Sequence, residues 1–99
     1  PAFVFYLLRA MKEAAAAGGL DDGAAERLAA QTFRGAAETV LRADEDVERL
    51  IDAVCSPNGT TIEGMRVLRD SAVEPTLGDA LDAAAERSDE LADEHDLDG

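Results

Sequence analysis

The sequence has little of several things that would point to other protein classes. It has no tryptophan, one cysteine and only four aromatic residues in 99. The single Cys55 excludes an internal disulfide framework and is typical of a reducing cytoplasm. No apolar run reaches the length of a membrane span, and no targeting segment is recognised. Runs of β-branched residues are too few to predict strands. These absences leave one small all-helical domain, residues 1–99, with a core that is marginal for a monomer.

Positive charge is also scarce. Nine Lys and Arg stand against 22 Asp and Glu, for a net charge of −13 and a pI near 4.2. This balance argues against nucleic acid and anionic membranes as partners. Eight of the nine cations are Arg, and Lys12 is the single lysine. Such a composition is typical of salt-loving archaea, whose cytoplasm screens the repulsion. An acidic protein from a GC-rich mesophilic genome is the alternative, and we favour the halophile.

Hydrophobic spacing and turn residues predict about five helices. We expect the first to end at Gly18-Gly19, and Asp21 or Asp22 to cap the second. We expect Pro75-Thr76 to break the chain before the last helix, and the charged tail from Asp93 to Gly99 to fray. The predicted helices cover about residues 2–17, 23–42, 47–54, 61–70 and 76–91.

The first predicted helix is apolar on nearly every side. Its residues from Phe3 to Leu8 are all apolar or aromatic, and a helix of this kind is normally buried all round. The second helix carries small residues, Ala29 and Gly35–Ala37, that permit close approach by another helix. Since the alanine-rich chain buries little area alone, we expect an intertwined homodimer or a missing domain to cover the remaining surface.

Turn residues, hydroxyl groups and a helix start converge on the loop from Cys55 to Gly64. Pro57, Asn58 and Gly59 favour a tight turn, and Thr60 with Glu63 predicts a capping box. The free N–H groups of the first helical turn make a helix start suited to a carboxylate or phosphate. Hydroxyls come from Ser56, Thr60 and Thr61. The alternative is an ordinary capped helix that binds only water.

Other candidate sites are weaker. Cys55 has no neighbouring base to activate it and is interpreted as a small buried residue. His95 lies among acids and could bind a metal, yet a solvated tail is favoured, because nothing fixes its geometry. The acids from Asp44 to Asp46 are interpreted as a helix cap and not as acid–base groups. Tyr6 is expected in the core, with its hydroxyl reaching an interface.

Four segments resemble the pyrroline-5-carboxylate reductase family, in the right order and spacing. They are Pro1–Phe5, Ala29–Ala37, Ser56–Gly64 and Ala80–Leu91. The third is similar to the family's Ser-Pro-Gly-Gly-Thr-Thr loop, with Asn58 where glycine is usual. Asn is the next-best residue for a left-handed conformation, so the loop shape can survive. The resemblance covers nearly the whole chain.

The resemblance implies a fold and a function. The fold would be the helical dimerisation domain typical of the 6-phosphogluconate dehydrogenase-like group. The family reduces the cyclic imine 1-pyrroline-5-carboxylate to proline with NADPH or NADH, the last step of proline synthesis. By position in the motif, the amides of Gly59, Thr60 and Thr61 would hold the substrate carboxylate, and Ser56 would add a hydroxyl contact. The Thr61 hydroxyl would reach the ring nitrogen, and Asn58 shapes the turn.

The resemblance is incomplete at the N-terminus. The chain contains no GxGxxG sequence after a strand, so no dinucleotide is expected to bind this chain alone. No metal is expected either. We expect a separate N-terminal dinucleotide-binding domain in the parent enzyme, and we interpret Pro1 as an artificial or proteolytic boundary. The isolated chain is then expected to be inactive. Two alternatives are a non-enzymatic helical dimerisation module and the helical domain of another dehydrogenase of the 6-phosphogluconate dehydrogenase-like group.

Overall fold

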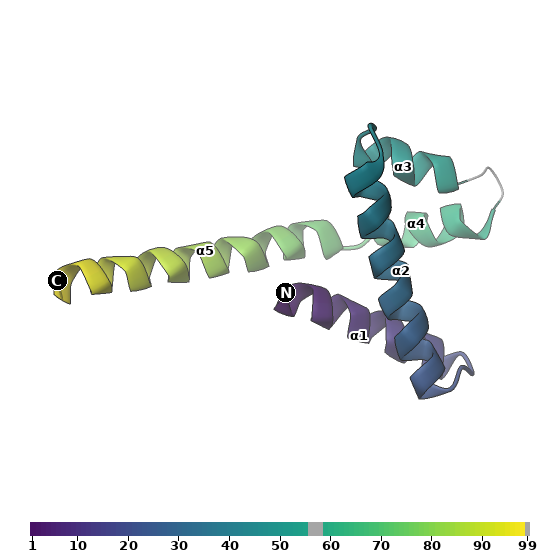
Figure 1. Cartoon of the computed structure of the whole chain (residues 1–99), viewed down its shortest axis with the longest axis horizontal. Helices are drawn as coiled ribbons and strands as arrows, with labels where there is room; N and C mark the ends of the chain where they lie inside the picture. The colour runs from purple at the N-terminus through teal and green to yellow at the C-terminus, as the bar shows by residue number, and fades with distance from the viewer. Residues whose placement is uncertain (56–58, 99) are drawn as a thin grey trace. The chain divides into compact units, whose positions relative to one another are not determined.

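A computed structural model of the chain describes residues 1–55 and 59–98, and side chains as far as Glu94. The described residues form helices and connecting turns without a strand, which confirms the all-α prediction. The elements appear in Figure 1. The helices are α1 (Ala2–Ala17), α2 (Asp22–Arg42), α3 (Val47–Val54), α4 (Thr60–Asp70) and α5 (Val73–Asp98).

The chain divides into two compact units. The first unit, Pro1–Asp52, holds α1, α2 and most of α3, and the second, Ala53–Gly99, holds α4 and α5. Each unit is described by itself. The prediction of one domain over residues 1–99 stays a prediction.

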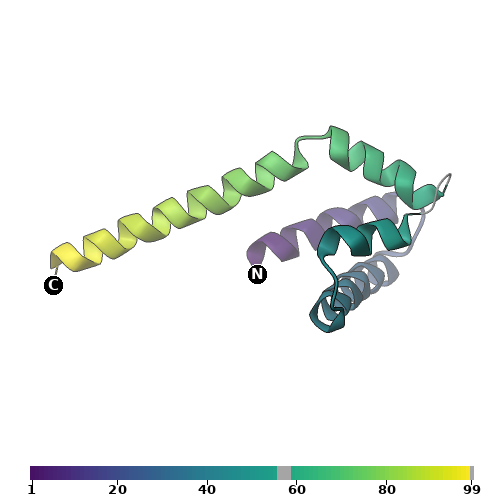
Figure 2. The ribbon, with the colours of Figure 1, turned by 90° about the horizontal axis from the view of Figure 1, so that it is seen from above.

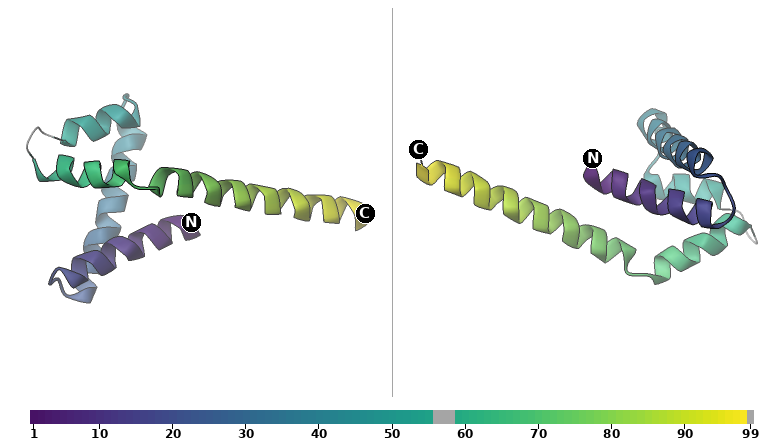
Figure 3. Two further views of the ribbon diagram at one scale, coloured as in Figure 1. Left: turned by 180° about the vertical axis from the view of Figure 1, so that it is seen from behind. Right: turned by 90° about the horizontal axis from the view of Figure 1, so that it is seen from below.

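Two glycines and an aspartate build the turn between α1 and α2. Gly18 ends α1, and Gly19 has φ +113°, a backbone conformation that L side chains rarely adopt. Asp21 then caps α2, since its carboxylate accepts a hydrogen bond from the Ala24 amide at 3.3 Å. Figures 1 and 3 show α1 and α2 joined at this turn, with the start of α1 lying away from α2. Both predicted turn signals are confirmed.

Small side chains let α1 and α2 approach each other near the turn. Ala25 is fully buried and Ala29 is 5 % exposed, and they are the buried hydrophobic residues of the described chain. The prediction of close helix approach is therefore confirmed at Ala29. Within one copy, a Cβ built on Gly35 would meet nothing within 4 Å, so close approach at Gly35 stays a prediction.

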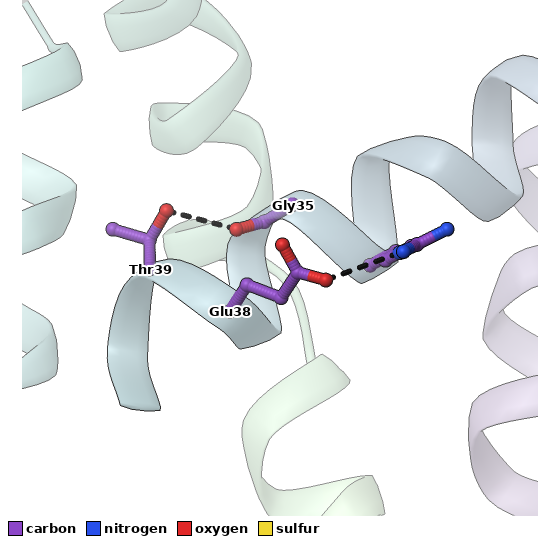
Figure 4. A network of polar contacts seen from close by, with 4 residues as sticks. Gly35, Glu38 and Thr39 are labelled. Carbon is purple, nitrogen blue, oxygen red and sulfur yellow. Dashed lines mark hydrogen bonds and ion pairs between the residues drawn. The ribbon is translucent and has the colours of Figure 1, made fainter. Parts of the chain in front are cut away.

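The C-terminal half of α2 carries local polar contacts (Figure 4). The Thr39 hydroxyl donates to the Gly35 carbonyl at 2.8 Å, and the Arg34 Nε donates to Glu38 at 3.1 Å. Both contacts join residues of the same helix four positions apart. The exposed Arg34–Glu38 pair adds modest support to the helix, whereas the Thr39 bond to a carbonyl of its own helix adds none.

Helix α3 begins where the acidic run ends. The Asp46 carboxylate accepts a hydrogen bond from the Arg49 amide at 2.9 Å. A carboxylate at this position satisfies a free N–H group and complements the helix dipole. The interpretation of Asp44–Asp46 as a helix cap is confirmed through Asp46.

Ser71 joins α4 to α5. Its hydroxyl donates to the Leu68 carbonyl at 2.6 Å and accepts from the Val73 amide at 3.2 Å. The last helix therefore starts at Val73, and the prediction of a break at Pro75-Thr76 is wrong. Pro75 is tolerated because amides in the first turn of a helix have no intrahelical partner.

The end of α5 also differs from the prediction. The backbone is helical through Asp98, seven residues beyond the predicted end at residue 91, and the expected fraying of the tail from Asp93 stays a prediction. The alanines between Asp82 and Glu86 have the highest helix propensity, and Arg87 pairs with acids one and two turns later. Figure 2 shows α5 as one helix running on from the turn that follows α4. The side chain of His95, and with it the metal-or-tail question, lies outside the described residues.

Large apolar side chains remain exposed in the single chain. Phe5 is 66 % exposed, Tyr6 64 % and Leu81 58 %, so Tyr6 is not in the core of one copy. The expected cover of the first helix by another subunit or domain stays a prediction. The described residues include no fully buried side chain larger than alanine. Much of the hydrophobic surface that the sequence provides is thus left unburied within one copy of the chain.

Candidate helix-start site at the 55–61 loop

The predicted site lies at the start of α4. Gly59 is the N-cap residue, with φ −82° and ψ 165°, and Thr60 and Thr61 are the first two helical residues. Of the predicted site residues, the structure therefore brings Gly59, Thr60 and Thr61 together. The other two, Ser56 and Asn58, lie outside the described residues.

No side chain caps this helix start among the described residues. The predicted capping box is wrong, because Thr60 is already inside the helix and the Glu63 side chain bonds toward the C-terminal end of α4 and not back to the N-cap. The Glu63 carboxylate accepts a charge-assisted hydrogen bond from Arg66 Nη1 at 2.6 Å. That bond to a cation one turn later replaces the bond back to the N-cap amide that a capping box requires.

A helix start that no described side chain caps has a chemical consequence. The first amides of a helix have no carbonyl partner within the helix, and the positive end of the helix dipole lies behind them. Gly59 is half-buried, whereas Thr60 and Thr61 are exposed residues. The arrangement can accept a carboxylate and place a hydroxyl beside it.

Cys55 lies immediately before the loop and is a free, half-buried thiol. The interpretation of Cys55 as a small buried residue is therefore met only in part. No described histidine or cation is in hydrogen-bond contact with the thiol, which gives no support to a nucleophile. Among the residues that the structure describes, no three His, Cys, Asp or Glu side chains are placed to hold a metal ion.

Two shallow grooves lie on α1 and α2 and contain no loop residue. The first is lined by Ala2, Phe5, Tyr6 and Arg9, and the guanidinium of Arg9 lies 5.3 Å from the centre of the Tyr6 ring. This contact was missed in the sequence, although the spacing of three residues places both on one helix face. The second is lined by residues of both helices: Met11, Ala15, Ala25, Leu28, Ala29 and Thr32.

Sequence comparison connects the chain to a known family. A family model described as pyrroline-5-carboxylate reductase dimerisation matches residues 1–91. The chain belongs to the pyrroline-5-carboxylate reductase dimerisation domain family. It corresponds to the C-terminal part of such reductases, as the resemblance of its four segments implied.

Individual reductases agree with the family match. The chain is 40 % identical over 92 residues to pyrroline-5-carboxylate reductase of Escherichia coli (strain K12), covering 93 % of this chain and 34 % of the relative. It is 41 % identical over 91 residues to the reductase of Methanosarcina acetivorans, covering 92 % and 34 %. The chain therefore spans about a third of the length of the relatives that it matches.

Solved reductase structures have the same fold over this region. A pyrroline-5-carboxylate reductase from Coxiella burnetii matches with a TM-score of 0.88 and 38 % identity, covering 92 % of this chain and 34 % of that one. The Plasmodium falciparum pyrroline carboxylate reductase with NADP bound matches with a TM-score of 0.85 and 32 % identity, covering 89 % and 34 %. The family match disfavours the alternative of a different dehydrogenase.

No helix within the described ranges is both long and apolar enough to cross a membrane.

Proposed function

We propose that this chain is the substrate-binding and dimerisation part of an enzyme that reduces 1-pyrroline-5-carboxylate to L-proline with NADPH or NADH. The observation that carries the proposal is the start of α4. Gly59, Thr60 and Thr61 form a helix N-terminus that no side chain of the described residues caps, at the position of the family's Ser-Pro-Gly-Gly-Thr-Thr loop. The substrate has the two groups that such a helix start can recognise, a carboxylate and a ring nitrogen.

The chain's contribution to the reaction is position. The amides of Gly59, Thr60 and Thr61 would hold the carboxylate, attracting it locally despite the net charge of −13. The Thr61 hydroxyl would accept a hydrogen bond from the protonated ring nitrogen, which fixes the imine carbon for attack. Ser56 would add a hydroxyl contact to the carboxylate, and Asn58 would shape the turn. No general acid or base among the described residues is required for these contacts.

The nicotinamide cofactor does not fit this chain. The described residues contain no strand, and the sequence contains no glycine-rich turn of the kind that cradles a dinucleotide pyrophosphate. We therefore place cofactor binding on an N-terminal domain of the parent enzyme. On this proposal the isolated chain has no reductase activity.

A homodimer completes the proposal. Phe5 and Leu81 are more than half exposed in one copy, and a second copy offers the same apolar surface in return. Dimers of dimers are compatible with this arrangement. The exposed apolar helices alone would also suit a non-enzymatic dimerisation module, which is the second candidate function.

The setting of the enzyme follows from composition. The free Cys55 fits a reducing compartment, and we place the enzyme in the cytoplasm. The acidic, lysine-poor sequence supports a halophilic source, where high salt screens the charge of −13.

Amide chemical shifts of this chain test the site without the cofactor domain. Titration with L-proline should move the amide resonances of Gly59, Thr60 and Thr61, with weak affinity, since one wall of the pocket is missing. Pyrrolidine has the same ring without the carboxylate and is the matched control, which should leave those resonances in place. Equal shifts with both compounds, or none with proline, would mean that the loop is only a turn and would favour the dimerisation module.

A further inference from the structure

Helix α5 has an unusual charge balance. Its 26 residues contain ten Asp and Glu and a single basic residue, Arg87, if His95 is neutral. Helix α2 is the natural comparison, because its three acids are matched by three arginines. Most of the chain's excess negative charge therefore lies on one helix.

Arg87 is the one described countercharge within α5, and it is shared between two acids. Its Nη1 lies 2.8 Å from Glu90 Oε2 and 3.8 Å from Glu94 Oε1. Each of the three side chains is more than half exposed. Exposed ion pairs of this kind are weak and sensitive to salt, and they are easily outweighed by repulsion among neighbouring acids.

Acidic neighbours surround the pair. Glu86 is four residues from both Asp82 and Glu90 and three residues from Asp89. Like charges at these spacings face each other on a helix and destabilise it. Of these acids, Glu90 alone forms an ion pair with a cation among the described residues.

Burial within the chain contributes little that could offset this repulsion. Of the α5 side chains described, those of Val73 and Ala80 are half-buried, and the others are exposed. Helical stability in proteins comes mainly from packing of one face, so α5 has to rely on its own sequence or on a second copy. The stripe that α5 offers to a second copy contains Leu77, Leu81 and Leu91, all exposed.

We propose that α5 is a salt-dependent element, in which Arg87 partly offsets the acidic repulsion and dissolved salt screens the remainder. In dilute buffer the C-terminal half of α5 loses helix. As the ionic strength rises, the helix forms and the Leu77–Leu91 stripe becomes ordered. Assembly through this stripe is then controlled by salt. The inference concerns folding and goes beyond the proposed reductase function.

Three single substitutions in the full chain test the inference. Arg87→Gln removes the shared countercharge, and Glu86→Gln removes one repelling acid. Arg34→Gln is the matched control, since it removes an exposed Arg–Glu pair from the charge-balanced α2. Helix content and thermal midpoints are measured by circular dichroism in dilute buffer and in about 1 M KCl, where the Debye length is ~3 Å. Molar sucrose is the control for stabilisation without screening.

In dilute buffer Arg87→Gln should lower the midpoint by about 3–6 °C, and the control by less than half of that. Glu86→Gln should raise the midpoint. In KCl, but not in sucrose, all three differences should shrink to about 1 °C or less. Equal losses for Arg87→Gln and Arg34→Gln in dilute buffer, or a loss that persists in KCl, would overturn the inference. The proline titration does not depend on either outcome.

Discussion

The Thr61 hydroxyl distinguishes two interpretations of the loop, a substrate-binding site and an ordinary turn. Thr61→Val keeps the side-chain shape and the backbone amide but removes the hydroxyl. In the parent reductase we expect a loss of about 1–3 kcal/mol in transition-state stabilisation, the usual result of deleting one partner of a desolvated polar group. Steady-state kinetics of kcat/KM would measure it. Thr76→Val, the same change on exposed α5, is the control.

Wild-type efficiency in Thr61→Val would make the hydroxyl dispensable, and the site assignment would then fall while the family membership stood. A loss of the same size in Thr76→Val would point to a general effect of the substitution. Asn58→Gly restores the family's own residue, so we expect it to be nearly neutral.

Aspartates that precede a helix could be predicted from the sequence, but the start of α4 could not. Asp21 and Asp46 each cap the helix that follows, as expected for short carboxylates at such positions. At α4 the same reasoning chose Thr60 as the cap, whereas Gly59 holds that position. The pattern Thr-x-x-Glu is ambiguous because Glu63 also has a cation, Arg66, one turn away.

At the scale of elements, the contact of α1 with α2 depends on alanine. Ala25 is fully buried where the helices approach, so a larger side chain there must push them apart. We expect Ala25→Leu to lower the free energy of unfolding by about 1–3 kcal/mol. Urea unfolding at fixed protein concentration would measure it. The control is Ala30→Leu, at an exposed position of the same helix, with a change of about 0.5 kcal/mol or less.

Similar losses in the two variants would show that the helices do not pack through Ala25. A loss confined to Ala25→Leu would confirm that the first unit depends on a close contact between small side chains.

Element boundaries could be predicted wherever glycine or a helix-capping residue marks them. The bounds of α1 and α3 match the prediction, and those of α2 and α4 differ by one residue at the start. The start of α5 was wrong because Pro75 was taken as a break, while Ser71 already supplies a cap two residues before Val73. Burial could not be predicted, since the apolar residues of α1 stay exposed in one copy. The spacing of apolar residues shows which side chains need to be buried, but not whether this chain, a second copy or another domain buries them.

At the scale of the whole molecule, exposed apolar area predicts association. We expect a homodimer that buries more than ~2,000 Å² in total, because no large side chain is buried within the described part of one copy. Sedimentation in molar KCl at micromolar concentration should show the dimer. Phe5→Asn, at a side chain 66 % exposed in one copy, should weaken the dimer at least about tenfold.

Gln31→Asn, a polar exchange at an exposed position of α2, is the control and should leave the dimer unchanged. A folded, stable monomer of the unmodified chain under these conditions would contradict the prediction.

The exposed apolar side chains of α1 and α5 and the residues of the loop are different residues. Phe5, Tyr6, Leu77 and Leu81 lie on α1 and α5, whereas the proposed substrate contacts lie between Ser56 and Thr61. A copy with a defective loop would therefore present an unaltered surface to its partner. In a cell that produces both kinds, defective and intact copies would pair at random, and an equal mixture would place half of all molecules in hybrids. Defective subunits would thus be distributed over hybrid dimers with intact subunits and would not be segregated into dimers of their own.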